Sequence, residues 1–90
     1  MYRLITPEQY RKQEKKFFKK HPELKEPYKK TLLLLMRDPF YPSLRLHKLQ
    51  GKLKTYYSVS ITMQYRIVID MLISDEEIIL LKIGDHDTVY

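Results

Sequence analysis

The chain has 90 residues, no cysteine and a formal net charge of +6 at pH 7. This length predicts a single domain spanning residues 1–90, and the absence of cysteine excludes disulfides and thiolate chemistry, which fits a reducing cytoplasm. The early charges argue against a secretory leader, and the longest apolar runs, 32–36 and 78–81, are too short to span a membrane.

The charge is distributed unevenly along the chain. Residues 1–37 carry eleven lysines and arginines against four acids, and residues 38–66 carry five against one. Residues 67–90 reverse the balance, with one lysine against six acids. A basic surface of this kind suits a polyanion or an acidic protein partner. For residues 11–30 alone, a solvated lysine-rich helix face that keeps the chain in solution explains the charge at least as well.

The first elements are a short strand and an amphipathic helix. Residues 2–5 predict the strand. A helix follows over residues 7–20, because the Thr6 hydroxyl can cap its first turn and Pro7 suits the first helical position. The aromatic residues of this helix share one side at helical spacing: Tyr10, Phe17 and Phe18.

A second helix is predicted over roughly residues 23–37, and Pro39 ends it. Its apolar side chains share one face: Leu24, Tyr28, Leu32, Leu35 and Met36. Two consecutive helices with a short connection predict an antiparallel helix hairpin.

The second half of the chain changes to a period of two, which is typical of strands. Strands are predicted over residues 56–63, 65–73 and 78–83, with a turn at 74–77. Short turns between strands predict an antiparallel meander, and we expect the first strand to join it. The sequence therefore predicts an α+β fold of order β-α-α-β-β-β, in which the helix hairpin packs on a small antiparallel sheet.

The connection between the second helix and the sheet, residues 42–57, mixes basic and aromatic residues more densely than any other part outside the helices. Its basic side chains are Arg45, His47, Lys48, Lys52 and Lys54. Cations that meet phosphates and rings that stack on bases are typical of proteins that bind single-stranded nucleic acid.

Two of the three histidines flank the predicted meander. His47 precedes it and His86 follows it, so the two can converge at one end of the sheet, with Arg66 beside them. Such a set can cleave RNA without a metal, because imidazole can donate or accept a proton near neutral pH and guanidinium stabilises the charge that develops on phosphate. His21, between the helices, is interpreted as structural.

Simpler interpretations of the same residues remain open. A single histidine is more often a surface or hydrogen-bonded residue than a catalyst. The Asp85-His86-Asp87 run could suggest a metal site, but adjacent side chains rarely reach one ion and no further ligand cluster accompanies them. We therefore expect neither a metal nor another cofactor.

Two stretches, taken together, resemble the RelE/ParE superfamily of bacterial toxins. They are LRLHKLQGKLKTYYSVSITMQYRIVI, residues 44–69, and LLKIGDHDTVY, residues 80–90. The first is similar to the stretch that runs from a loop with the general base or its partner, through a glycine and aromatic residues, into an arginine-bearing strand. The second is similar to the last strand followed by a catalytic histidine and a terminal aromatic residue. The resemblance covers essentially the whole chain and points to the RelE-like mRNA interferases of the YafQ and YoeB branch.

The resemblance implies an active site, position by position. His86 matches the C-terminal catalytic histidine and would be the general acid, with His47 as the general base or its partner. Arg66 matches the arginine that stabilises the phosphate, and Tyr90 matches a terminal aromatic residue that would stack on an mRNA base or brace His86. The resemblance and the basic stretch together indicate RNA-binding residues: Arg45, Lys48, Lys52, Lys54 and Tyr65.

The resemblance also implies a function, namely the toxin of a type II toxin–antitoxin system that cleaves ribosome-bound mRNA by metal-independent acid–base chemistry. Its partners would be a cognate antitoxin, the ribosome and mRNA, in the cytoplasm. Two positions depart from the family pattern, since Ser60 stands where YafQ has another active-site histidine and Gln64 replaces an acid.

Three other functions compete with this one. The chain could be a ParE-like toxin that binds DNA gyrase without catalysis, although such chains usually lack the histidine and arginine set. It could be a toxin relic that only binds its antitoxin. It could also be an RNA-binding module that does not cut.

Overall fold

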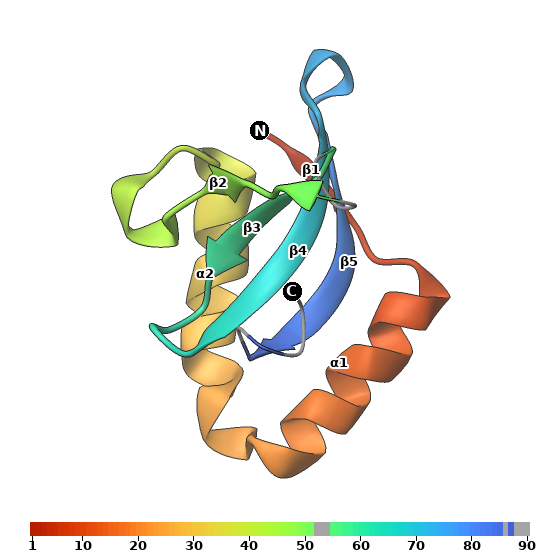
Figure 1. Ribbon diagram of the computed structural model, residues 1–90, viewed down its shortest axis with the longest axis vertical. Coiled ribbons are helices and arrows are strands. Elements are labelled where there is room, and N and C mark those ends of the chain that lie inside the picture. Colours follow the sequence, from red (N-terminus) through yellow and green to blue (C-terminus); the bar gives the residue numbers. More distant parts are fainter. Residues whose placement is uncertain (52–54, 86, 88–90) are drawn as a thin grey trace.

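The structure, a computed structural model, describes residues 1–51, 55–85 and 87. Two helices lie against a five-stranded sheet whose strand order is β1-β5-β4-β3-β2 (Figure 1). The strands are β1 (Arg3–Ile5), β2 (His47–Lys48), β3 (Tyr57–Ser60), β4 (Tyr65–Leu72) and β5 (Glu77–Asp85). The helices are α1 (Glu8–Lys20) and α2 (Lys25–Arg37), with 3-10 turns at Pro22–Leu24, Pro42–Leu44 and Ile73–Asp75. None of the described helices combines the length and apolar character that crossing a membrane requires.

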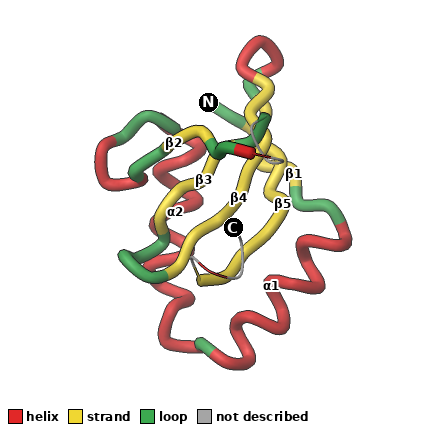
Figure 2. Tube along the Cα trace, viewed as in Figure 1, coloured by secondary structure: helices red, strands yellow, loops and turns green. Residues whose placement is uncertain are grey.

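The α+β class and the order of the predicted elements are confirmed, and the sheet adds two details of pairing. β3, β4 and β5 form the predicted antiparallel meander, and a two-residue strand, β2, extends it beside β3. β1 joins the sheet as predicted, but it pairs with β5 in parallel, so the sheet is mixed rather than wholly antiparallel. Between β1 and the meander the chain runs through the two helices (Figure 2). A connection of this length allows β1 to lie parallel to β5.

The start of α1 differs from the prediction. Pro7 occupies the N-cap position, and no side chain caps the helix. The Thr6 hydroxyl instead accepts a hydrogen bond of 3.1 Å from Arg11 Nε. The first turn is therefore closed by the backbone, with the Arg11 amide donating to the Pro7 carbonyl.

The main core lies between the helices and one face of the sheet. Alternate residues of the strands supply it, and aromatic residues from both helices cover them. Its buried members include Tyr10, Phe17, Tyr28, Leu35, Val59, Ile67, Ile69, Ile78 and Leu80. A smaller cluster, with Leu49 and Val68 at its centre, lies apart from this core.

The two helices diverge from their junction at residues 21–24, so they form a splayed pair rather than a closely packed hairpin (Figure 1). Buried polar side chains bridge the gap. The hydroxyls of Tyr10 and Tyr28 lie 2.8 Å apart, and the Tyr28 hydroxyl also donates to the Glu14 carboxylate. α1 and α2 therefore meet through long side chains, which include the Phe18 ring, 4.8 Å from that of Tyr28.

Candidate functional site

The register of the strands places the predicted site residues on the face of the sheet opposite the main core, here called the open face. Val59 and Ile67 point into the main core. Their neighbours along the strands therefore point the other way, since side chains alternate across a strand. Ser58, Ser60 and Arg66 are thus on the open face.

The open face carries two adjacent rows of side chains. Residues that are register partners on neighbouring strands share a face of the sheet. One row runs across all four strands of the antiparallel part: His47, Ser58, Val68 and Lys82. The next row consists of Ser60, Arg66 and Gly84. His47 and Arg66 are therefore brought to the same patch, with Ser58 between them.

The Arg66 guanidinium uses only part of its capacity for hydrogen bonds within the described part of the chain. The side chain is half-buried, and its Nη1 donates to Ser58 Oγ over 3.4 Å. Among the described residues, its buried Nε has no hydrogen-bond partner and no carboxylate forms an ion pair with the guanidinium. A half-buried cation without a counter-ion is electrostatically poised to bind an anion.

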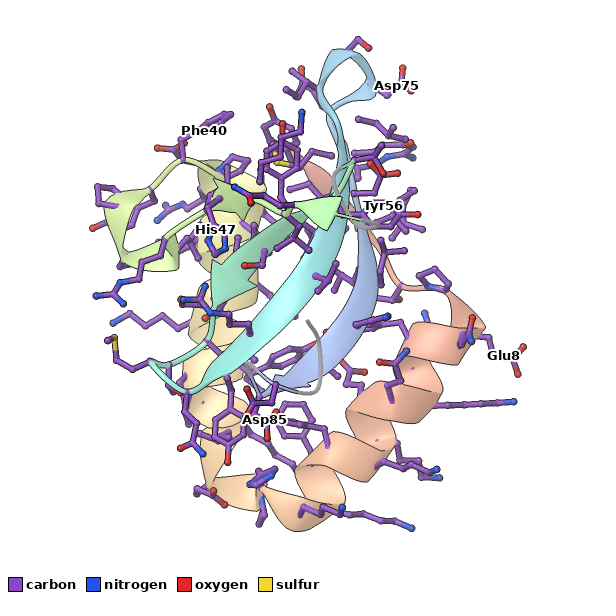
Figure 3. All side chains as sticks on the ribbon, in the orientation of Figure 1. Glu8, Phe40, His47, Tyr56, Asp75 and Asp85 are labelled. Carbon is purple, nitrogen blue, oxygen red and sulfur yellow. The ribbon has the colours of Figure 1, made fainter. Side chains whose placement is uncertain are left out.

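His47 lies at the β2 edge of the sheet and is exposed (Figure 3). Its Nδ1 is 3.3 Å from the backbone carbonyl of Arg45, a residue held in the left-handed conformation at φ 50°. If Nδ1 carries the proton and donates to this carbonyl, Nε2 keeps its lone pair and can accept a proton. The geometry of the connection thus favours the tautomer that a general base requires.

Four of the predicted site residues, His86, Tyr90, Lys52 and Lys54, lie outside the described residues, and their roles stay predictions. The described part of β5 does run beside the site, because Gly84 is the register partner of Arg66.

Three predicted RNA-binding residues lie within the described part of the chain. Arg45 is exposed next to His47. Lys48 is also exposed, but it pairs with Tyr57, whose side chain packs on the main core, so the register directs it away from the open face. Tyr65 likewise points to the helix side, where its ring lies 5.4 Å from that of Phe17. Of these three residues, only Arg45 lies near the His47 ring.

Tyr65 lines a separate cleft of about 610 Å³ between the C-terminal half of α1 and the end of β5. Figure 3 shows Asp85 at this end of β5. The remaining lining residues are mostly basic or aromatic, and they include Lys16, Lys19, Lys20 and His21. His21 packs its ring 4.9 Å from those of Phe17 and Tyr65 and lies 3.6 Å from the Glu23 carboxylate, contacts that fit the structural role expected of it.

The two serines of β3 were not predicted as site residues, and Ser60 was noted only as a departure from the family pattern. Ser58 is fully buried and Ser60 is 6% exposed, and both share the open face with Arg66. The alternation of Val59 and Ile61 with these serines was the available signal, since it places the hydroxyls opposite the core. As for metals, residues 1–51, 55–85 and 87 contain no group of three or more histidine or acidic side chains that could hold an ion.

Comparison with known proteins gives matches of structure and not of sequence. No protein-family model and no curated protein matches the sequence. YafQ from E. coli strain BL21(DE3) matches with a TM-score of 0.81 at 17% identity, covering 100% of this chain and 99% of that one.

Two further structures match almost as completely. The YoeB–YefM complex from Staphylococcus aureus gives a TM-score of 0.73 at 20% identity, covering 96% of this chain and 98% of that one. A YoeB/ParE toxin from Agrobacterium tumefaciens gives 0.69 at 20% identity, with coverages of 96% and 99%. At these identities the likeness establishes a shared fold.

Proposed function

The chain has the fold of the RelE-like toxins, and from this premise we propose that it is the toxin of a type II toxin–antitoxin system and cleaves mRNA on the ribosome. The observation that supports this most is the patch on the open face. There Arg66 has no counter-ion among the described residues, and His47 is two strands away across Ser58. An endoribonuclease can work without a metal if a cation stabilises the charge on the phosphate and imidazoles transfer the protons.

The proposed chemistry divides among three side chains. His47 takes the proton from the ribose 2′-hydroxyl, which then attacks the adjacent phosphorus. Arg66 stabilises the negative charge that grows on the non-bridging oxygens. His86 donates a proton to the departing 5′-oxygen, and Tyr90 stacks on a base or braces His86. Each acid–base contribution is typically worth ~10²–10⁴-fold in rate.

The basic helix α1 supports the proposal that a large polyanion is the platform for this reaction. Its C-terminal half carries Lys15, Lys16, Lys19 and Lys20, all exposed, and none of them forms an ion pair with a described residue. Ribosomal RNA is such a polyanion, and it would hold the toxin by phosphate contacts while the open face meets the mRNA.

The second proposed partner is an antitoxin. YoeB is known in complex with YefM, and this chain shares its fold. The same basic surfaces would suit an acidic antitoxin. The proposed place of action is the cytoplasm, where ribosomes and antitoxin are present.

The test is cleavage by the purified protein of a radiolabelled mRNA, with and without ribosomes. We expect cuts only on the ribosome-bound mRNA, and a loss of at least ~10²-fold in rate for His86→Ala, His47→Ala and Arg66→Gln. Lys30→Gln, an exposed change on α2, serves as the control and should cut at the wild-type rate. Equal cutting by His86→Ala would overturn the role of that histidine.

Gyrase inhibition is the second candidate, because the fold is shared with a YoeB/ParE toxin as well. Inhibition of DNA supercoiling without any mRNA cleavage would decide for it. Binding to an antitoxin with neither activity would identify a toxin relic.

A further inference from the structure

Two buried polar atoms lack a hydrogen-bond partner among the described residues, and both are on the open face. They are the hydroxyl oxygen of Ser60 and the Nε of Arg66. The two residues are register partners on β3 and β4. Since nearly all buried polar groups are paired, two unpaired donors on directly opposed residues call for a shared explanation.

Their placement fits a single acceptor between them. Side chains of opposed residues in an antiparallel pair have Cβ atoms about 4.5–5.5 Å apart. The guanidinium is held from the other side, because its Nη1 donates to Ser58 Oγ. On β5 the row continues with Gly84, which has no side chain to cover the guanidinium. One oxygen atom could therefore accept from Arg66 Nε and from the Ser60 hydroxyl together.

The side chains around this position indicate what kind of group the acceptor is. The neighbouring side chains on the open face, His47 and Lys82, are basic, and the described residues supply Arg66 with no carboxylate. Phosphate oxygens suit such a site, because a guanidinium provides charge and fixed direction and a hydroxyl can rotate to complete the set.

We propose that Ser60 and Arg66 Nε form a two-donor seat for one non-bridging oxygen of a phosphodiester, which makes Ser60 a phosphate-binding residue of this site. The inference rests on the proposed function, since the phosphodiester meant here is that of the mRNA. It assigns to Ser60 a hydroxyl contact at a position where the sequence reasoning had seen only a departure from the family pattern.

An unpaired hydroxyl predicts opposite effects on stability and on binding. In Ser60→Ala the protein loses a buried hydroxyl that has no partner among the described residues, so its melting temperature should stay the same or rise. The phosphate loses a donor, so its affinity should fall. Hydrogen bonds that involve a charged group correspond to roughly ten- to a hundredfold in a binding constant.

The experiment measures the binding of adenosine 3′-monophosphate to the wild type and to Ser60→Ala by calorimetry, with melting temperatures recorded in parallel. We expect Ser60→Ala to bind at least about tenfold more weakly with no loss of melting temperature. Ser74→Ala, an exposed serine in the turn between β4 and β5, is the matched control and should equal the wild type. Equal affinity in Ser60→Ala would overturn the proposal, and so would a clear fall in melting temperature, because it would show that the hydroxyl already has a structural partner.

A second measurement needs no variant. The NMR signal of the Arg66 Nε–H should move downfield when adenosine 3′-monophosphate or inorganic phosphate is added to the wild type, as expected when this group begins to donate. A signal that does not move would contradict the proposed hydrogen bond from Arg66 Nε to the phosphate. Neither measurement depends on catalysis. A protein that binds phosphate through Ser60 but never cuts mRNA would refute the proposed function, and phosphate binding by Ser60 and Arg66 would still stand.

Discussion

The chemistry of the open face depends on the direction in which single side chains point. Arg66 and Tyr65 are neighbours in β4, yet Tyr65 packs against Phe17 while Arg66 reaches Ser58 on the opposite face. The sequence showed both as candidates for RNA contact. The alternation of side chains across the strand separates them, so that a phosphate on the open face can meet Arg66 and not Tyr65.

Residues of the candidate site differ in how far they could be predicted. His47 and Arg66 were chosen for their chemistry, and the register places them two strands apart with Ser58 between. The pairing of Ser60 with Arg66 was not foreseen, because it depends on which residues of β3 and β4 stand opposite each other. A pattern of period two fixes the face of a side chain but not its partner on the next strand.

The buried tyrosines give a prediction at high pH. Burial raises the pKa of Tyr10 and of Tyr28 well above the ordinary tyrosine value, and the nearby Glu14 carboxylate adds to the increase. The unfolded chain releases these protons near pH 10, while the folded protein retains them. The stability from this difference is complete below about pH 10 and is lost as the pH rises further.

We therefore expect the urea midpoint of the wild type to fall steeply above about pH 10. Tyr28→Phe should be less stable at neutral pH by about 1–3 kcal/mol, because it leaves Tyr10 and Glu14 without a partner, and its decline at high pH should be shallower. Tyr41→Phe changes an exposed tyrosine and is the control. A decline equally steep in Tyr28→Phe would contradict this account of the cluster.

At the scale of elements, α1 completes the edge of the sheet. β1 covers the outer edge of β5 only as far as Ile79. Beyond it, the Gln13 amide takes the place of a neighbouring strand, since its Nε2 donates to the Leu81 carbonyl over 3.1 Å and its Oε1 accepts from the Ile83 amide over 3.3 Å. The register between β4 and β5 shifts at the same level, next to Val68.

Removal of the two Gln13 hydrogen bonds should loosen the end of β5. For Gln13→Met we expect the free energy of unfolding to fall by roughly 1–3 kcal/mol, because two partly buried backbone groups lose their side-chain partner. Hydrogen exchange at the Ile83 amide should become faster, as measured by NMR. Gln9→Met, an exposed change on the same helix, is the control. An Ile83 amide that stays as protected as in the wild type would show that Gln13 does not hold the strand.

Local sequence patterns predicted the helices and the main strands, but they did not predict every pairing of the strands. Alternating apolar residues predicted β3, β4 and β5 and their meander. The parallel pairing of β1, the short β2 and the register shift beside Val68 depend on contacts between distant segments. The predicted cap of α1 was wrong for a local reason, because the Thr6 hydroxyl accepts a hydrogen bond from the Arg11 side chain instead of capping the helix.

At the scale of the whole molecule, the candidate site and the lysines of α1 are separated in space. The open face carries the candidate site. α1 carries exposed lysines that form no ion pair with a described residue, and they lie beside two clefts that do not include Arg66. One cleft lies against the end of β5, and the other, of about 490 Å³, lies between the helices and is lined by Phe18, Tyr28 and four lysines. The lysines of α1 and the candidate site are therefore on different parts of the surface.

The binding of ribosomes should therefore depend on salt through α1. Each lysine that contacts a phosphate contributes about 0.7–0.9 to the slope of log affinity against log salt. The double variant Lys16→Gln/Lys19→Gln should bind more weakly and lower this slope by roughly one to two, as measured by cosedimentation over a series of KCl concentrations. Lys30→Gln on α2 should lower it by less. An unchanged slope in the double variant would place the ribosome contact elsewhere.

The most direct test of the central claim, that the patch around Arg66 cleaves mRNA on the ribosome, is the mapping of mRNA 5′ ends in cells after brief induction. Wild type and Arg66→Gln would be compared at equal protein levels. The account predicts new cuts in register with the reading frame for the wild type and none for Arg66→Gln. The same cuts in both would show that the Arg66 guanidinium is not part of the active site, and an absence of cuts in the wild type would contradict the nuclease function itself.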